Sequence, residues 1–223
     1  MRLLLVRHGE AQWNAERRFM GQEDSPLTHR GKAQVAAVAT RLSDEKVDAI
    51  ISSDLGRAHR TATGISTSCG VELMLDTRLR ERHAGVLQGL GVEEAKRRYP
   101  EVFSGFRELG PSFRIPGGES AAEVETRVRS FLEDMHAYPR ETTVVAVTHG
   151  AILMAFLRIT LCIPHDTTAR VGFRNTCICE LRSGDDGWEL HRWNDTCHLG
   201  EVDRQEDGTR ADEQARAADG MRR

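Results

Sequence analysis

Charged and titratable side chains follow the apolar runs of this sequence, at the points where buried strands would end. Arg7 and His8 follow the apolar run at the N-terminus, and His149 follows a later run. Arg57 comes a few residues after another such run. Two arginines and two histidines suit a tetrahedral anion, because a guanidinium fork matches phosphate oxygens in a bidentate manner. These residue types therefore favour phosphate chemistry.

One of the two histidines could attack phosphorus. A histidine has an ordinary pKa near ~6.5, so a neutral, nucleophilic imidazole is available at neutral pH. Attack would give a phosphohistidine, and fixed cations would stabilise the charge on the transferring group. The leaving alkoxide then needs a proton from a carboxylic acid, for which Glu81 is the leading candidate.

Each residue taken alone also has an ordinary structural explanation. His149 could be a polar residue at the end of a strand, and Arg57 could lie on a helix surface. Glu81 could be a solvated or salt-bridged carboxylate. The prediction therefore rests on the combination of these residues.

Strands and helices must bring these distant residues together. Apolar segments alternate with segments of helical periodicity, which predicts an α/β fold: a three-layer α/β/α sandwich with a mainly parallel central sheet. Ligands of such sheets bind beyond the carboxyl ends of the strands. A helix opening after His149 would add a partial positive charge there. We therefore expect one rim to carry Arg7-His8, Ser52-Ser53 and His149-Gly150.

The expected strands are residues 3–6, 47–53, 71–75 and 142–149, with a hairpin at 176–181 and 188–193. The expected helices are residues 28–42, 54–68, 92–99, 120–136 and 151–161. Thr28 and Asp54 are expected N-caps, and Ser120 with Glu123 forms a capping-box pattern.

Residues 83–118, the lid segment, are rich in glycine and proline, which predicts a loop-rich lid insertion. Its aromatic residues could form an apolar wall for the substrate or could anchor the loops to the core. These residues are Phe103, Phe106 and Phe113. Arg107 and Arg114 could read a second acidic group.

Length and composition indicate one large domain. The 223 residues suffice for a domain at 1–200, followed by a charged, flexible tail at 201–223. A net charge of −3 gives no overall reason to expect binding to nucleic acid or a membrane. No apolar run approaches the roughly 20 residues of a bilayer span. The five cysteines fit no disulfide framework or zinc pattern, so we expect reduced thiols and a cytoplasmic protein.

The motifs that carry these residues resemble those of the histidine phosphatase superfamily, also called phosphoglycerate mutase-like. They are LVRHGE at 5–10, SSDLGRAHRTA at 52–62, LRER at 79–82, PGGES at 116–120 and VTHG at 147–150. The resemblance covers roughly residues 1–198. Glu10-Ala11-Gln12 follows RHG, as in the branch with a glutamate donor, whereas the other branch carries RHGxRxP and a His-Asp donor pair.

The resemblance implies roles for the rim residues. His8 would accept the phosphoryl group, and Arg7, Arg57 and His149 would complete the phosphate pocket. Glu81 would donate the proton and later activate water. No metal is implied, because arginine and histidine replace its charge. The candidates for substrate binding are Asn14, Met20, Gly21, Gln22, His59, Arg82, His83 and Gly150.

Two activities compete within this branch. Residues 81–90, ERHAGVLQGL, are similar to the pattern of the cofactor-dependent phosphoglycerate mutases. That pattern has Tyr where this chain has Ala84, Lys where it has Val92, and a paired arginine run where Arg107 and Arg114 stand isolated. A mutase must retain a bisphosphorylated intermediate, so losing these charged groups favours hydrolysis. The N-terminal stretch and WNDTCHL near 199 resemble small bacterial phosphatases that often carry a mutase label.

The leading interpretation is a metal-independent phosphomonoesterase acting on a small phosphorylated metabolite. The alternatives are a phosphoglycerate mutase primed by 2,3-bisphosphoglycerate, a non-catalytic phosphate-binding protein, and a metal hydrolase using His8, Glu81 and His149. No cofactor is expected for the phosphatase. The expected partner is a small phosphate ester, with neither nucleic acid nor membrane, and a homodimer is possible.

Overall fold

The computed structural model describes residues 1–108, 110–165, 167, 171–200 and 202, and leaves aside the side chains of residues 106–108. Its strands are β1 (Arg2–Arg7), β2 (Ala49–Ser52), β3 (Leu73–Leu75), β4 (Thr143–Thr148), β5 (Ile178–Ser183) and β6 (Trp188–Asp195). In this part of the chain they form one sheet in the order β3-β2-β4-β1-β5-β6. Strands β3, β2, β4 and β1 run parallel, and β5 and β6 run antiparallel to their neighbours. The mainly parallel sheet and the terminal hairpin are confirmed.

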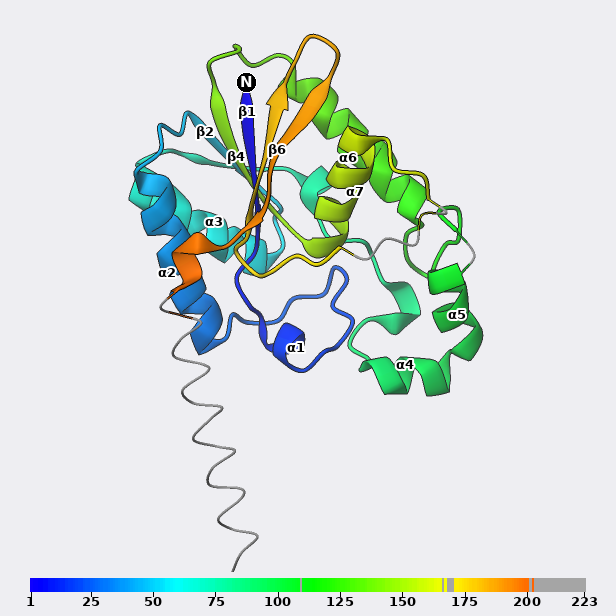
Figure 1. The fold of residues 1–223 in the computed structure, drawn as a ribbon. Helices are drawn as coiled ribbons and strands as arrows, with labels where there is room; N and C mark the ends of the chain where they lie inside the picture. Colours follow the sequence, from blue (N-terminus) through cyan, green and yellow to red (C-terminus); the bar gives the residue numbers. More distant parts are fainter. Residues whose placement is uncertain (109, 166, 168–170, 201, 203–223) are drawn as a thin grey trace, which may run out of the picture.

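Helices cover both faces of the sheet. They are α1 (Gln12–Ala15), α2 (His29–Ser43), α3 (Gly56–Cys69), α4 (Val92–Arg98), α5 (Pro100–Glu108), α6 (Ala121–Met135) and α7 (Gly150–Leu161). Helices α2 and α3 lie on one face, and α6 and α7 lie on the other, while α1, α4 and α5 gather near the end where β1 leads into α1 (Figure 1). This arrangement confirms the predicted α/β/α sandwich.

The position of strand β1 inside the sheet explains why its sequence is apolar throughout rather than alternating. Leu3 and Leu5 belong to the apolar cluster under α6 and α7. Leu4 and Val6 belong to the cluster under α2 and α3. Both faces of the strand are therefore buried, as expected for a parallel sheet with helices on each side. A strand buried on both sides holds the residues at its end firmly in place.

Two of the three predicted helix caps are confirmed. Thr28 accepts a hydrogen bond from the backbone of Gly31, and Ser120 forms the capping box with Glu123. The cap predicted at Asp54 is wrong, because its carboxylate instead forms an ion pair with Arg80. The start of α3 is capped from a distant loop: Asp24 Oδ1 accepts a hydrogen bond from the Arg57 backbone, 3.1 Å away. A cap that comes from another loop leaves no local signal in the sequence.

The lid segment contains more helix than predicted, since α5 follows α4 almost directly. It has an apolar cluster of its own, made by Ala84, Leu87, Leu90, Ala95 and Ile115. Phe103 and Phe113 pack against this cluster, and Phe103 meets Phe19 edge-on with ring centroids 6.4 Å apart. These two aromatic residues therefore anchor the lid. The side chains of Phe106 and Arg107 lie outside the described residues.

The remaining predictions concern the C-terminal tail, membrane-spanning segments and the cysteines. Apart from residue 202, the charged tail predicted for 201–223 lies outside the described residues. Among the residues that the structure covers, no helix is long and apolar enough to cross a membrane. All five cysteines carry free thiols, and Cys177 and Cys179 are buried.

Candidate active site

The register of the sheet brings the two histidines side by side. Arg7 at the end of β1 lies opposite Thr148 at the end of β4. The next residues, His8 and His149, therefore emerge at the same height, and their ring centroids lie 5.0 Å apart. Strand β2 adds Ser53, whose hydroxyl lies 2.9 Å from Nε2 of His149. Residues far apart in sequence thus meet because parallel strands end at one rim.

Two arginine side chains are buried beside the histidines. Arg57 donates to the carbonyls of Glu23, at 2.8 Å, and Gly21, at 2.7 Å, and its nearest carboxylate oxygen, on Asp24, is 3.7 Å away. Arg7 donates to the carbonyl of Phe173 at 2.5 Å. Burial lowers the pKa of both arginines, and the nearby Glu81 partly offsets this effect. Backbone carbonyls orient these guanidinium groups, and the carboxylates near them, Asp24 and Glu81, offset only part of the effect of burial.

Three buried nitrogens of this cluster have no hydrogen-bond partner among the residues that the structure describes. They are Nε of Arg7, Nε of Arg57 and Nδ1 of His149. An unsatisfied buried polar group costs about 1–3 kcal/mol, and more if it is charged. Such groups in a native structure need an explanation, and an oxyanion bound among them would supply acceptors for all three. The cluster therefore has the donor set of an anion site.

The hydrogen bonds of His8 fix its tautomer. Its Nδ1 lies 2.7 Å from the carbonyl oxygen of Gly9, which can only accept, so Nδ1 carries the proton and Nε2 keeps its lone pair. Burial, together with the charges of Arg57 and Arg7, holds the pKa of His8 well below its usual range. Its backbone is also fixed, because Asn175 donates to its carbonyl at 2.9 Å. His8 is thus a neutral, oriented imidazole.

His149 is kept neutral by the same causes. Burial lowers its pKa well below the usual range, and the charge of Arg57 and the neighbouring His8 lower it further. Its contact with Ser53 uses one ring nitrogen and leaves Nδ1 for another partner.

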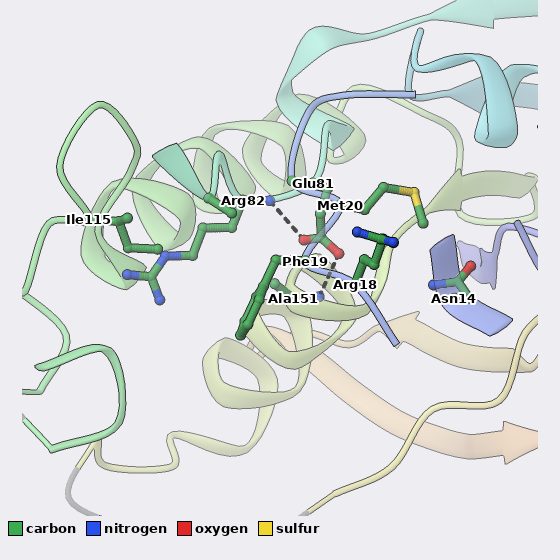
Figure 2. Close-up of a pocket in the computed structure, with 10 residues that line it drawn as sticks. Asn14, Arg18, Phe19, Met20, Glu81, Arg82, Ile115 and Ala151 are labelled. Atoms are coloured by element: carbon green, nitrogen blue, oxygen red, sulfur yellow. Dashed lines mark hydrogen bonds between the residues drawn. The ribbon is translucent and has the colours of Figure 1, made fainter. Parts of the chain in front are cut away.

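Glu81 faces this cluster from the loop after β3. Its Oε1 accepts a hydrogen bond from the backbone of Arg82 at 2.7 Å, and its Oε2 accepts one from Ala151 in the first turn of α7 at 3.3 Å (Figure 2). A methyl group placed on Gly150 would lie 3.9 Å from both Glu81 Oε2 and Arg7 Nε. The Glu81 carboxylate and the Arg7 guanidinium therefore both lie close to Gly150, at the start of α7.

A cavity of about 240 Å³ opens beside Glu81. Four of the predicted substrate-binding residues line it: Asn14, Met20, Gly21 and Arg82. The rest of its wall was not predicted and consists of Arg18, Phe19, Ala84, Ile115 and Ala151. Figure 2 shows these side chains around the Glu81 carboxylate, with Asn14 on α1 and Ile115 at the far side. The main cavity, as we call it, is therefore walled by the loop after β1, the lid segment and α7.

The other predicted binding residues have different surroundings. His59 lies exposed on α3. His83 accepts a hydrogen bond from the Gly85 backbone and so stabilises a turn. Gln22 donates to the carbonyl of Glu81 at 3.1 Å and to the Glu119 carboxylate at 3.4 Å. Gln22 and His83 therefore act on the loop that carries Glu81.

A charged pair that the sequence analysis missed fixes this loop. Arg127 on α6 donates to the carbonyl of Glu81 at 3.2 Å and pairs with the Glu119 carboxylate at 3.1 Å. Glu119 in turn accepts a hydrogen bond from the His83 backbone at 2.8 Å. The PGGES motif contains Glu119 and was the available signal, but Arg127 reads as an ordinary charge on an amphipathic helix.

The positions at which the mutase pattern differs have informative surroundings. Ala84, which replaces a tyrosine, is buried in the cavity wall. Val92 is 38% exposed on α4. Arg114 forms an ion pair with Glu123 at 3.1 Å.

Over the described residues, no group of three or more histidine, cysteine, aspartate or glutamate side chains has the spacing of a metal site.

Comparison with known proteins agrees with this arrangement. The family model described as "Histidine phosphatase superfamily (branch 1)" matches residues 3–196. A relative from Photorhabdus laumondii, named "Probable phosphoglycerate mutase GpmB", is 40% identical over 207 residues, which are 89% of this chain and 95% of the relative. A relative of the same name from Escherichia fergusonii is 38% identical over 208 residues, with the same coverage.

Solved structures share the fold. A mycobacterial glucosyl-3-phosphoglycerate phosphatase in complex with VO3 superimposes with a TM-score of 0.80 at 32% identity, covering 87% of this chain and 99% of its own. Bacillus stearothermophilus YhfR gives a TM-score of 0.82 at 29% identity, covering 89% and 98%. The chain therefore belongs to the histidine phosphatase superfamily, branch 1, and is an enzyme of the phosphohydrolase type.

Proposed function

We propose that this protein is a metal-independent phosphomonoesterase that hydrolyses a small phosphorylated metabolite through a phosphohistidine on His8. The observation that carries the proposal is the neutral His8 imidazole, whose Nδ1 proton is held by Gly9. Next to it lie two buried arginines with unpartnered Nε atoms. A nucleophile and a set of cationic donors for the same phosphate oxygens thus occur together.

In the first step, Nε2 of His8 attacks phosphorus and the bond from phosphorus to the ester oxygen breaks. Arg7, Arg57 and His149 donate hydrogen bonds to the three equatorial oxygens, whose charge spreads in the transition state. Glu81 gives its proton to the departing oxygen, so the alcohol leaves neutral. The products of this step are the free alcohol and phosphohistidine.

In the second step, water replaces the alcohol. The Glu81 carboxylate takes a proton from water, the water oxygen attacks phosphorus, and the bond from Nε2 to phosphorus breaks. Inorganic phosphate leaves, and both His8 and Glu81 return to their starting protonation states. The hydrogen bonds from Arg82 and Ala151 to Glu81 keep the carboxyl group in place for both transfers.

Hydrolysis is favoured over the mutase reaction by the wall of the main cavity. A mutase has to hold a bisphosphorylated intermediate while it reorients, which needs further charged groups that face the ligand. Here Ala84 stands in the wall where the mutase pattern has tyrosine, and Arg114 is paired with Glu123. The mycobacterial neighbour's name, a glucosyl-3-phosphoglycerate phosphatase, also supports a phosphatase.

The free cysteines support a reducing, cytoplasmic location.

Incubation with 3-phosphoglycerate separates the two activities. The phosphatase releases inorganic phosphate without a primer and in the presence of a chelator. A mutase would form 2-phosphoglycerate only after addition of 2,3-bisphosphoglycerate. Loss of activity on chelation would instead indicate a metal hydrolase. A screen of phosphorylated metabolites for phosphate release then identifies the preferred ester.

A further inference from the structure

A second cavity of about 210 Å³ lies next to the main cavity. Its wall consists of Arg82, Ala121, Val124, Glu125, Ala151, Met154, Ala155, Arg158 and His165, and we name it the side chamber. Arg82 and Ala151 line both cavities. The side chamber therefore adjoins the main cavity, and Arg82 and Ala151 border both.

Both of these residues also hold the proton donor, since the Arg82 backbone donates to Oε1 of Glu81. The Ala151 backbone donates to Oε2 of Glu81. Because Glu81 has to reach the leaving oxygen, the alcohol part of the ester starts at this carboxylate and extends away from the buried cluster. Ala151 and Arg82, which hold this carboxylate, also border the side chamber. Two adjoining cavities therefore lie beside the position of the alcohol group.

The polar groups of the side chamber are engaged with the protein. Arg82 donates to the carbonyls of Glu119 and Phe113, at 2.9 and 3.1 Å. Arg158 donates to the carbonyl of Pro164 at 2.6 Å. His165 and Glu125 pair with each other at 3.0 Å.

What remains for a ligand is apolar. The rest of the wall is formed by small or apolar side chains from α6 and α7: Ala121, Val124, Ala151, Met154 and Ala155. The aliphatic stems of Arg82 and Arg158 extend this surface. Most of the surface that the described residues offer a ligand here is therefore apolar, which suits the chamber to shape and apolar contact.

We propose that the side chamber binds an apolar portion of the substrate's alcohol group, so the preferred esters carry a larger apolar group than a three-carbon acid. The main cavity alone is smaller than the roughly 300–1,000 Å³ of typical ligand pockets, and the adjoining side chamber adds about 210 Å³. This inference rests on the proposed function, because it names the class of ester that the same site takes.

A series of straight-chain alkyl phosphates from ethyl to octyl tests the inference. The leaving-group chemistry stays constant along the series while the apolar length grows. The kcat/KM for phosphate release is expected to rise by roughly three- to fourfold per added methylene, until the chamber is filled. Equal kcat/KM values for all lengths would overturn the inference and leave the proposed function standing. Absence of phosphate release from every ester would overturn the proposed function itself.

Variants at the start of α6 locate the effect. Ala121→Leu fills the side chamber, and the ratio of kcat/KM for hexyl to ethyl phosphate should fall at least tenfold. Ala122→Leu adds the same group one residue along, where the side chain lines neither cavity, and should keep the ratio of the wild type. An equal fall in both variants contradicts the assignment.

A second substitution covers the case in which Ala121→Leu does not fold. Met154→Ala enlarges the chamber, so the length at which kcat/KM stops rising should move to a longer ester. If that length does not change, the side chamber does not hold the alkyl chain.

Discussion

The arginines at the rim of the sheet and those of the lid segment have different hydrogen-bond and ion-pair partners. At the rim, Arg7 and Arg57 are oriented by backbone carbonyls at 2.5–2.8 Å and keep unpartnered Nε atoms. Around the lid, Arg98 pairs with Glu94 at 3.3 Å, and Arg114 pairs with Glu123 at 3.1 Å. The carboxylate oxygen of Asp24 lies 3.7 Å from Arg57, whereas these two lid arginines have closer carboxylate partners.

Burial sharpens this contrast. Arg57 is completely buried, but the Arg114 side chain is 65% exposed. A buried cation interacts with a bound phosphate in a low dielectric, where electrostatic interactions are much stronger than in water. An exposed ion pair contributes at most about 1 kcal/mol. The rim is therefore built for the reaction itself, and the lid can select substrates through shape and apolar contact.

Equal substitutions at the two regions should have very unequal effects. Arg57→Met removes a buried donor for the transferring phosphoryl group, and we expect kcat to fall about 10²- to 10³-fold. Arg114→Met removes an exposed ion pair and should change kcat by less than twofold. Steady-state kinetics with one phosphate ester, together with circular dichroism of each variant, checks this. Similar losses in both variants would remove the distinction between rim and lid.

Glu81, the proposed proton donor, should give the next largest effect. Glu81→Gln cannot protonate a departing oxygen, so an alkyl phosphate should lose about 10²-fold or more in kcat, within the range of general acid catalysis. An aryl phosphate, whose leaving group needs little protonation, should lose far less. Parallel kinetics on the two esters measures the ratio. Equal losses would argue that Glu81 is not the donor.

The pair that holds the Glu81 loop should have a moderate effect. Arg127→Met removes the donor to the Glu81 carbonyl and the partner of Glu119, and we expect kcat to fall about tenfold. The loss should be larger for an alkyl than for an aryl phosphate, because a displaced Glu81 protonates the leaving oxygen less well. Arg129→Met, an exposed residue two positions along α6, is the matched control. A loss of stability with equal losses on the two esters would mean that Arg127 has only a structural role.

The buried histidines should make stability depend on pH. Their pKa values in the folded protein lie well below the ordinary value near ~6.5, so the unfolded chain binds protons that the folded chain does not. The free energy of unfolding should therefore be highest above pH ~6.5 and fall on acidification, by about 1.4 kcal/mol per pH unit for each histidine. Urea unfolding, measured between about pH 5 and about pH 8, where histidine titrates, gives this slope.

A histidine variant isolates this contribution. His149→Gln should make the slope shallower, whereas His59→Gln, which alters an exposed residue of α3, controls for loss of an imidazole. An unchanged slope in His149→Gln would show that acid destabilisation has another source.

The fold could be predicted from the sequence to a large extent because its signals are local. The apolar runs of β1 and β4 are buried on both faces, and the cap at Thr28 and the capping box at Ser120 use residues within one turn. The exceptions depend on distant contacts. Asp24 caps α3 from another loop, so Asp54 looked like the better cap. Helix α5 packs against the apolar cluster of the lid and against Phe19, in a stretch where glycine and proline suggested loops.

The site could be predicted only in part for the same reason. The motifs mark His8 and His149, and the rule for parallel sheets brings them to one rim, where the structure has them 5.0 Å apart. No local pattern indicates that Arg127 supports the Glu81 carbonyl from α6, or that Ala121 and Met154 border a second cavity. Those relations arise from tertiary packing and become visible only in three dimensions.

Trapping the covalent intermediate tests the central claim most directly. The protein is mixed with an ester carrying a radioactive phosphate, quenched with alkali within the first turnovers, and analysed for protein-bound label. The account predicts a label that is stable to alkali and lost in acid, as expected of a phosphohistidine, and that is absent from His8→Ala, which keeps the wild-type circular dichroism but no turnover. A His8→Ala variant that still acquires the label, or that hydrolyses esters at a near-normal rate, would contradict the assignment of His8 as the nucleophile.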